Sequence, residues 1–338
     1  MPFAMMRARH RRMRRHRARV LPVLALALWL APLGGLRAET VLVSNEKGNS
    51  ITVLDGESLK VLRTVPVGQR PRGIVLSQDK KTLYICASDD DEIETLDLDK
   101  FTLGPPLPSG PDPETFALHP DGVHLYVANE GNSLVSIVDI AARRISGEIP
   151  VGVEPEGMGI SPDGKWIVNT SETTSMAHFI DNDTRKVMAN VLVDSRPRRA
   201  VWTADGKEVW VSSEIGGTVS VIDPTSHKIV HKIAFAKPGI PQEAIQAVGI
   251  ALTKDRKLAF VALGPANQVA VVDAQSYEVK KYLQVGQRVW NLAFNSDESR
   301  LYTTNGISND ISMIDVPNLK VLKSVTVGNQ PWGVVVRP

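Results

Sequence analysis

The sequence contains very little cysteine, since Cys86 is the one thiol among its 338 residues. A single cysteine excludes an intramolecular disulfide, C-x-x-C-H haem attachment and a zinc site built from a cysteine cluster. The sequence also lacks long amphipathic segments with a 3.6-residue period, which excludes a solenoid of helix pairs. We therefore expect a fold of short elements that is held together by core packing alone.

Acidic residues are absent from the first 38 positions, which contain nine arginines. An apolar run over residues 20–31 follows most of these arginines, and small residues over 31–38 come next, with Ala38 as the expected last residue of a cleaved segment. This order is typical of a signal peptide. The apolar run is shorter than the ~20 residues that cross a bilayer as a helix, although an uncleaved signal anchor is the alternative.

We therefore expect a signal peptide over residues 1–38, export to the periplasm and no membrane span after cleavage. Arginine pairs in this segment leave twin-arginine export open beside the general secretory route. After its removal, 30 basic residues (39 less the nine arginines) face 37 acidic residues, a formal charge of −7. This charge disfavours broad nucleic-acid binding, for which a basic surface is required, although local arginine clusters still allow a restricted site.

The remaining residues, 39–338, repeat with a period of 42. Two apolar residues followed by Asp recur seven times, loosened at Thr95, with Asp spacings of 42, 42, 42, 42, 50 and 42. A proline landmark keeps the same register, with Ala247 and Val289 in place of proline in two units. The aspartates are Asp55, Asp97, Asp139, Asp181, Asp223, Asp273 and Asp315, and the prolines are Pro71, Pro113, Pro155, Pro197 and Pro331.

Each unit contains four short segments with strand character. Residues 125–129 and 133–139, for example, are rich in Val and Ile and are separated by a Glu-Gly-Asn turn. Four antiparallel strands in ~40–45 residues are typical of one β-propeller blade. Six complete units, and a seventh assembled from residues 39–69 and 331–338, predict one all-β domain over 39–338. We expect a seven-bladed β-propeller with four-stranded antiparallel blades and a closing blade made from both termini.

Positions that recur in every unit are expected to serve the fold. The seven aspartates are expected to cap the turns that follow them. An aromatic-rich column is expected to pack between blades, and Cys86 is expected to fill a small-residue position. The column comprises Tyr84, Tyr126, Val168, Trp210, Phe260 and Tyr302.

The positions beside the landmark are those where the units diverge. They fall where the outer strand of one blade leads to the inner strand of the next, and propellers usually bind ligands where such loops converge on the central channel. We predict a ligand- or partner-binding rim with exposed tryptophans there, with an ordinary solvated surface as the alternative. The rim residues are Arg70, Arg72, Glu114, Glu156, Arg196, Arg198, Arg288, Trp290 and Trp332.

Arginine and tryptophan together suit a small anionic or aromatic ligand, or an acidic patch of a partner protein. The rim positions contain no histidine, and we predict no catalytic residues. The acidic run over residues 89–94 has Glu94 where an EF-hand loop requires glycine, so we predict no metal site either.

The segment Tyr126-Val127-Ala128-Asn129, followed by residues 134–139, resembles the YVTN-type β-propeller repeat. Seven such repeats behind a signal peptide resemble the family of propellers associated with pyrroloquinoline quinone (PQQ)-dependent catabolism. The resemblance implies a periplasmic accessory protein, whose partner would be a quinoprotein dehydrogenase or a transport component. It implies no catalytic residues. The adjacent cysteine pair and the repeated Trp motif of quinoprotein dehydrogenases are missing, so we expect no bound cofactor.

Three classes of function follow. The first is a non-enzymatic periplasmic binding protein associated with PQQ-dependent alcohol catabolism. The second is a propeller-type hydrolase or lyase, which would need a convergent histidine or metal–carboxylate set on the rim. The third is a single-stranded DNA-binding propeller, which the resemblance to YncE-like propellers suggests and the acidic charge disfavours.

Overall fold

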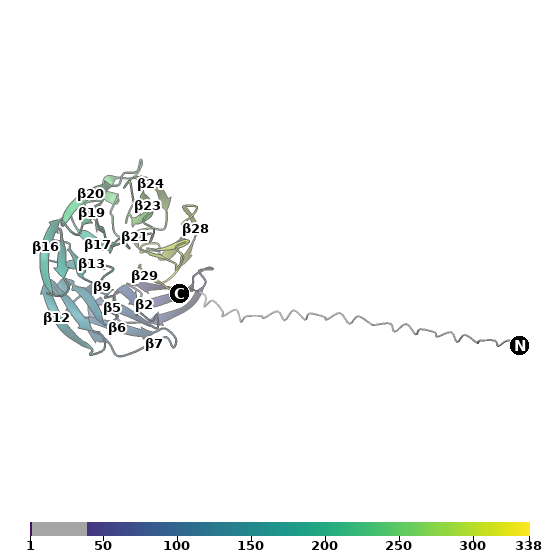
Figure 1. Cartoon of the computed structure of the whole chain (residues 1–338), viewed down its shortest axis with the longest axis horizontal. Coiled ribbons are helices and arrows are strands. Elements are labelled where there is room, and N and C mark those ends of the chain that lie inside the picture. The colour runs from purple at the N-terminus through teal and green to yellow at the C-terminus, as the bar shows by residue number, and fades with distance from the viewer. Residues whose placement is uncertain (2–38) are drawn as a thin grey trace. The chain divides into compact units, whose positions relative to one another are not determined.

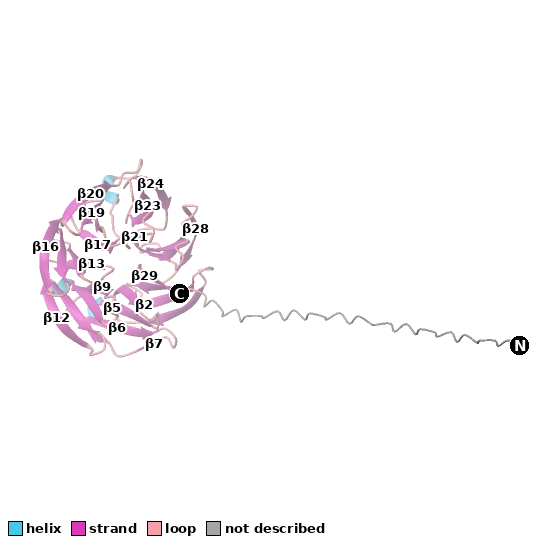
Figure 2. Cartoon of the chain, in the orientation of Figure 1, coloured by secondary structure: helices cyan, strands magenta, loops and turns pink. Residues whose placement is uncertain are grey.

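The computed structural model describes Met1 and residues 39–338. Throughout residues 39–338, short segments in which apolar and polar residues alternate form β-strands (Figure 2). The predicted signal peptide therefore lies outside the described residues, apart from Met1. Three single turns of 3-10 helix, η1 (Ser88–Asp90), η2 (Glu130–Asn132) and η3 (Gln242–Ala244), interrupt the strands. Among the described residues, none belongs to a helix long and apolar enough to cross a membrane.

The strands form seven separate antiparallel sheets arranged around a central axis (Figure 1). The first strands of neighbouring sheets contact one another, so they are the inner strands that surround the channel. In ring order they are β4 (Pro71–Leu76), β9 (Pro113–Leu118), β13 (Pro155–Ile160), β17 (Pro197–Trp202), β21 (Ile250–Leu252), β25 (Val289–Phe294) and β29 (Pro331–Arg337). The fold class is thus confirmed as a seven-bladed β-propeller.

The two middle strands of each blade are its most buried. The second strands are β5 (Thr82–Ala87), β10 (His124–Asn129), β14 (Trp166–Ser171), β18 (Val209–Ser213), β22 (Leu258–Ala262), β26 (Arg300–Asn305) and β1 (Thr40–Asn45). The third strands are β6 (Glu92–Asp97), β11 (Leu134–Asp139), β15 (Met176–Asp181), β19 (Thr218–Asp223), β23 (Gln268–Asp273), β27 (Asp310–Asp315) and β2 (Ser50–Asp55).

The outer strands are more exposed. They are β12 (Arg144–Pro150), β16 (Lys186–Leu192), β20 (Lys228–Ala234), β24 (Val279–Gln284), β28 (Lys320–Thr326) and β3 (Val61–Pro66), with the pair β7 (Thr102–Leu103) and β8 (Leu107–Pro108) in the blade that starts at β4. This blade departs from four strands because the outer strand is split at Pro105 and Pro106, which lack the N–H that a ladder requires.

One blade joins the two ends of the described range. In it β29 pairs with β1, with Thr40 opposite Arg337 and Leu42 opposite Val335. The resulting sheet order is β29-β1-β2-β3, which agrees with the closing blade expected from the sequence. The pairing covers an edge of β1 that would otherwise offer unpaired backbone groups.

The hydrophobic core lies between the blades. One cluster, for example, joins Val43 of β1 to Tyr302 of β26 and Met313 of β27. The recurring aromatic positions behave as predicted, with Tyr126, Trp210 and Phe260 all buried. The recurring aspartates accept hydrogen bonds from the turns that follow them, as Asp55 does from the Ser58 N–H at 2.7 Å.

Hydroxyl groups also link the blades around the channel. Four inner strands receive a Ser or Thr side chain from the second strand of their own blade, and this side chain also bonds to the next blade. The Thr304 hydroxyl accepts the Asn291 N–H at 3.1 Å and donates to the Trp332 carbonyl at 2.7 Å. Ser44, Thr170 and Ser212 make the same two contacts in their blades.

Candidate functional site

The predicted rim residues lie at the end of the channel where the inner strands begin. In every blade but one, the residue after the landmark is the second residue of an inner strand, and Val248 takes the equivalent place just before β21. The blades also share the backbone conformation of the residue just before the landmark. In six of the seven blades this residue has a positive φ of 52–59°. The turn is therefore the same while the side chains differ, so backbone geometry does not dictate their chemistry.

In the first half of this ring, two carboxylates on neighbouring blades lie between arginines. Arg72 contacts Glu114 through Nε and Oε2 at 2.7 Å and reaches the Glu156 carboxylate at 3.6 Å. Arg198 contacts the same oxygen of Glu156 at 2.9 Å. Arg70 pairs with Glu114 at 2.8 Å. Each carboxylate is therefore held between two guanidinium groups, which for Glu156 come from two different blades.

The second half of the network uses glutamates that follow the second strands. Arg196 contacts Glu172 at 2.7 Å and Glu214 at 3.3 Å. Arg288 contacts Glu214 at 2.6 Å, and Arg198 pairs with both glutamates. The structure thus brings all five predicted arginines into one network, to which Glu172 and Glu214 must be added.

The expectation that both tryptophans are exposed is wrong. Trp332 is buried with 4% exposure, and Trp290 is intermediate. The Arg72 guanidinium carbon lies 4.8 Å from the centre of the Trp332 ring, and that of Arg288 lies 4.2 Å from the Trp290 ring. An arginine therefore stacks on a face of each tryptophan ring. Such cation–π stacking shields the guanidinium group and the ring from water. Glu114, Glu156 and Arg198 are buried as well, so the predicted rim is an enclosed charge network at the channel end.

Burial governs the protonation of this network. Burial raises the pKa of Glu114 well above its ordinary value, because Arg72 offsets only part of the desolvation. Burial also acts to raise the pKa of Glu156, but Arg198 and Arg72 outweigh it and the pKa is lowered. The pKa values of the two neighbouring carboxyl groups are therefore shifted in opposite directions, and ionisation is less favoured at Glu114 than at Glu156. Burial raises the pKa of Glu172 to about 7, against the opposing charge of Arg198.

A cavity of about 250 Å³ opens between these side chains. Five arginines, three glutamates and two tryptophans form its lining, so the lining has an excess of positive charge. The residues are Glu46, Arg70, Arg72, Glu130, Arg196, Arg198, Glu214, Arg288, Trp290 and Trp332. Seven of the nine predicted rim residues therefore line one cavity, while Glu114 and Glu156 lie behind the arginines.

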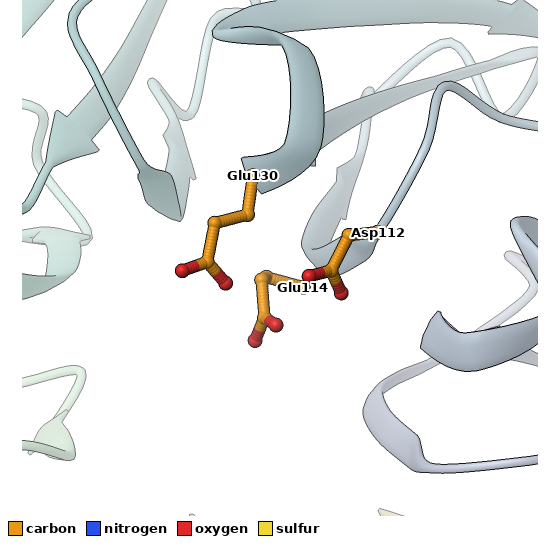
Figure 3. A group of neighbouring side chains, drawn as sticks. All are labelled: Asp112, Glu114 and Glu130. Atoms are coloured by element: carbon orange, nitrogen blue, oxygen red, sulfur yellow. The ribbon is translucent and has the colours of Figure 1, made fainter.

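Three carboxylates beside the cavity lie close enough together to be considered as metal ligands. Asp112, Glu114 and Glu130 have ligand oxygens within 4.8 Å of one another (Figure 3). Arg70 already pairs with Asp112 and Glu114. We therefore assign these two carboxylates to the arginine network, while Glu130 lines the cavity.

No protein-family model matches the sequence, and no curated protein is significantly similar to it. Solved structures share its fold. Kuenenia stuttgartiensis hydrazine synthase aligns with a TM-score of 0.76 and 21% identity over 82% of this chain and 92% of that chain. A protein of unknown function from Desulfotomaculum acetoxidans aligns with a TM-score of 0.75 and 14% identity, over 88% and 98% of the two chains. A Bacteroides fragilis protein described as a candidate 6-phosphogluconolactonase aligns with a TM-score of 0.74 and 19% identity, over 90% and 99%. At these identities the similarity shows the propeller fold alone.

Proposed function

We propose that the protein is a non-enzymatic binding propeller that holds a small polycarboxylate at the end of its channel. The observation that supports this proposal is the cavity of about 250 Å³ whose lining includes five arginines. Guanidinium groups bind carboxylates through two parallel hydrogen bonds, which gives both affinity and geometric selectivity. A guanidinium stays protonated at neutral pH, so this lining is suited to holding an anion rather than to abstracting a proton.

The carboxylates behind the arginines prepare the site for binding. Glu114, Glu156 and Glu172 hold Arg72 and Arg198 in place, so these arginines lose little conformational freedom when a ligand arrives. Binding is stronger when such ordering is already present in the free protein. Arg196 is the most accessible of the five arginines, with 49% of its side chain exposed, and it would meet an entering anion first.

We further propose that the ligand belongs to PQQ-dependent alcohol catabolism and that the protein acts in the periplasm. The resemblance to PQQ-associated propellers supports this assignment, and PQQ is itself an aromatic quinone that carries carboxylates. In this proposal PQQ or a related quinone carboxylate is a dissociable ligand. N-terminal sequencing of the exported protein tests the location, with Glu39 as the expected first residue and an intact apolar segment in a membrane fraction as the contrary result.

Isothermal titration calorimetry tests the ligand class. The ligands are PQQ, a non-aromatic tricarboxylate such as citrate, and a single-stranded oligonucleotide. Arg196→Gln should weaken carboxylate binding by roughly 10- to 100-fold, because a charge-assisted hydrogen bond contributes ~1.5–3 kcal/mol. Arg144→Gln, at an exposed position of β12, removes the same charge far from the cavity and should leave binding unchanged. Binding of the oligonucleotide but of neither carboxylate would support the nucleic-acid alternative and contradict the proposal.

A further inference from the structure

The third residue of each unit, counted from the landmark, packs closely against the next inner strand. Glycine occupies this position in four blades, as Gly73, Gly157, Gly249 and Gly333. A Cβ atom on Gly157 would lie 2.0 Å from the carbonyl oxygen of the next blade, and one on Gly249 would lie 2.5 Å from another such oxygen. The other three blades have Thr115, Arg199 and Asn291 at this position. Close packing favours glycine here, so packing does not explain these three side chains.

Two of these three side chains are satisfied by the next blade. The Thr115 hydroxyl donates to the Glu156 carbonyl, and the Asn291 amide donates to the Trp332 carbonyl at 2.9 Å. The equivalent carbonyl beside Arg199 belongs to Val248 and already accepts the Ser212 hydroxyl at 2.5 Å. Among the described residues, no carboxylate forms an ion pair with the Arg199 guanidinium.

The Arg199 side chain lines the interior of the channel. Along the ring, β17 is flanked by β13 and β21. Arg199 nevertheless lines a cavity of about 150 Å³ whose other walls come from β25, β29, β4 and β9 on the opposite side. Arg199 therefore lines a part of the channel that is shared with strands that do not neighbour β17.

The surroundings of Arg199 leave its charge uncompensated. Burial lowers the pKa of Arg199, and Glu156 is the carboxylate that acts in the opposite direction. Glu156 is already bound by Arg198 at 2.9 Å. Arg199 is of intermediate exposure, and because a guanidinium keeps its proton in a protein, its unpaired positive charge is available to an anion in the channel.

We propose that the channel holds a small anion on Arg199, at a site separate from the cavity at the channel end. The cavity has the volume of about five water molecules, which admits chloride, nitrate or acetate together with ordered water. It excludes an aromatic polycarboxylate of the size proposed for the outer cavity. The channel anion would act as a structural counter-ion that neutralises the inner wall.

Thermal unfolding at constant ionic strength tests this proposal. Chloride, nitrate or acetate replaces gluconate stepwise, because gluconate is too large for the inner cavity. The melting temperature of the wild-type protein should rise with the small anion and then saturate, as expected for a ligand that binds only the folded state. Arg199→Leu should abolish the saturable rise and should melt higher than the wild type in gluconate, since it removes an unpaired, partly buried charge from the channel. Arg144→Leu should keep the wild-type response.

The same series separates the two sites. Arg196→Gln should keep the rise with small anions and lose binding of the polycarboxylate, whereas Arg199→Leu should show the reverse pattern. If Arg199→Leu fails to fold, bromide-soaked wild-type crystals provide the second test, with an anomalous peak expected next to the Arg199 guanidinium. A response that is equal in the wild type and in Arg199→Leu would overturn the proposal, and so would a channel without bromide.

Discussion

Glu114 and Glu156 occupy equivalent positions in neighbouring blades, yet we expect losses of stability of different size from the same substitution. Glu156 is ionised, with 3% exposure, and lies 2.9 Å from Arg198 and 3.6 Å from Arg72. Glutamine at this position would leave two enclosed guanidinium groups without their shared counter-charge. Breaking a buried ion pair in this way costs ~3–5 kcal/mol of unfolding free energy.

Burial raises the pKa of Glu114, so its ionised form is less favoured than that of Glu156, and Glu114→Gln removes less favourable charge than Glu156→Gln. We expect it to cost less than ~1.5 kcal/mol, the range of a single hydrogen bond. Urea unfolding at neutral pH, followed by tryptophan fluorescence, measures both variants against the wild type. Equal losses for the two variants, or a larger loss for Glu114→Gln, would refute this ordering of the two carboxyl groups.

Three further outcomes are expected. The pKa of Glu172 is raised to about 7 from an ordinary 4.5, so its contribution to stability is present below pH 4.5 and is lost as the pH rises through 7. Between pH 5 and pH 8 the wild type should therefore lose up to ~3 kcal/mol relative to Glu172→Gln, and parallel pH profiles would contradict this. A chain that ends at Asn329 lacks β29 and with it the burial of Trp332 and Val334, roughly 3–6 kcal/mol for the two side chains. It should not unfold cooperatively near the full-length melting temperature, whereas a chain that ends at Arg337 should. Thr304→Val removes the hydroxyl that joins the Asn291 N–H to the Trp332 carbonyl and should cost ~1–3 kcal/mol in chemical unfolding, while Thr326→Val on the exposed outer strand should cost little.

The fold could be predicted because its determinants repeat along the chain. Seven aspartates and the proline landmark keep one register, and the structure places them at turns and at the starts of inner strands. The column that includes Tyr84, Tyr126 and Tyr302 packs between blades, as its recurrence indicated. The split outer strand at Pro105 and Pro106 is a local departure that does not disturb this register.

The candidate site could be predicted only in part. Sequence divergence between the units at the positions beside the landmark identified the arginines. It does not show whether a side chain is exposed to solvent or packs against another side chain. Trp332 was expected to be exposed and is buried because Arg72 stacks on it. Arg199 was missed, although a signal exists in the sequence, since it stands where four of the seven blades have glycine.

The structure of the protein crystallised with PQQ tests the central claim most directly. The account predicts density for the ligand in the outer cavity, with its carboxylates on Arg196 and Arg288 and its ring system near Trp290. An outer cavity without ligand at saturating PQQ, or PQQ bound only on the opposite face of the propeller, would contradict it.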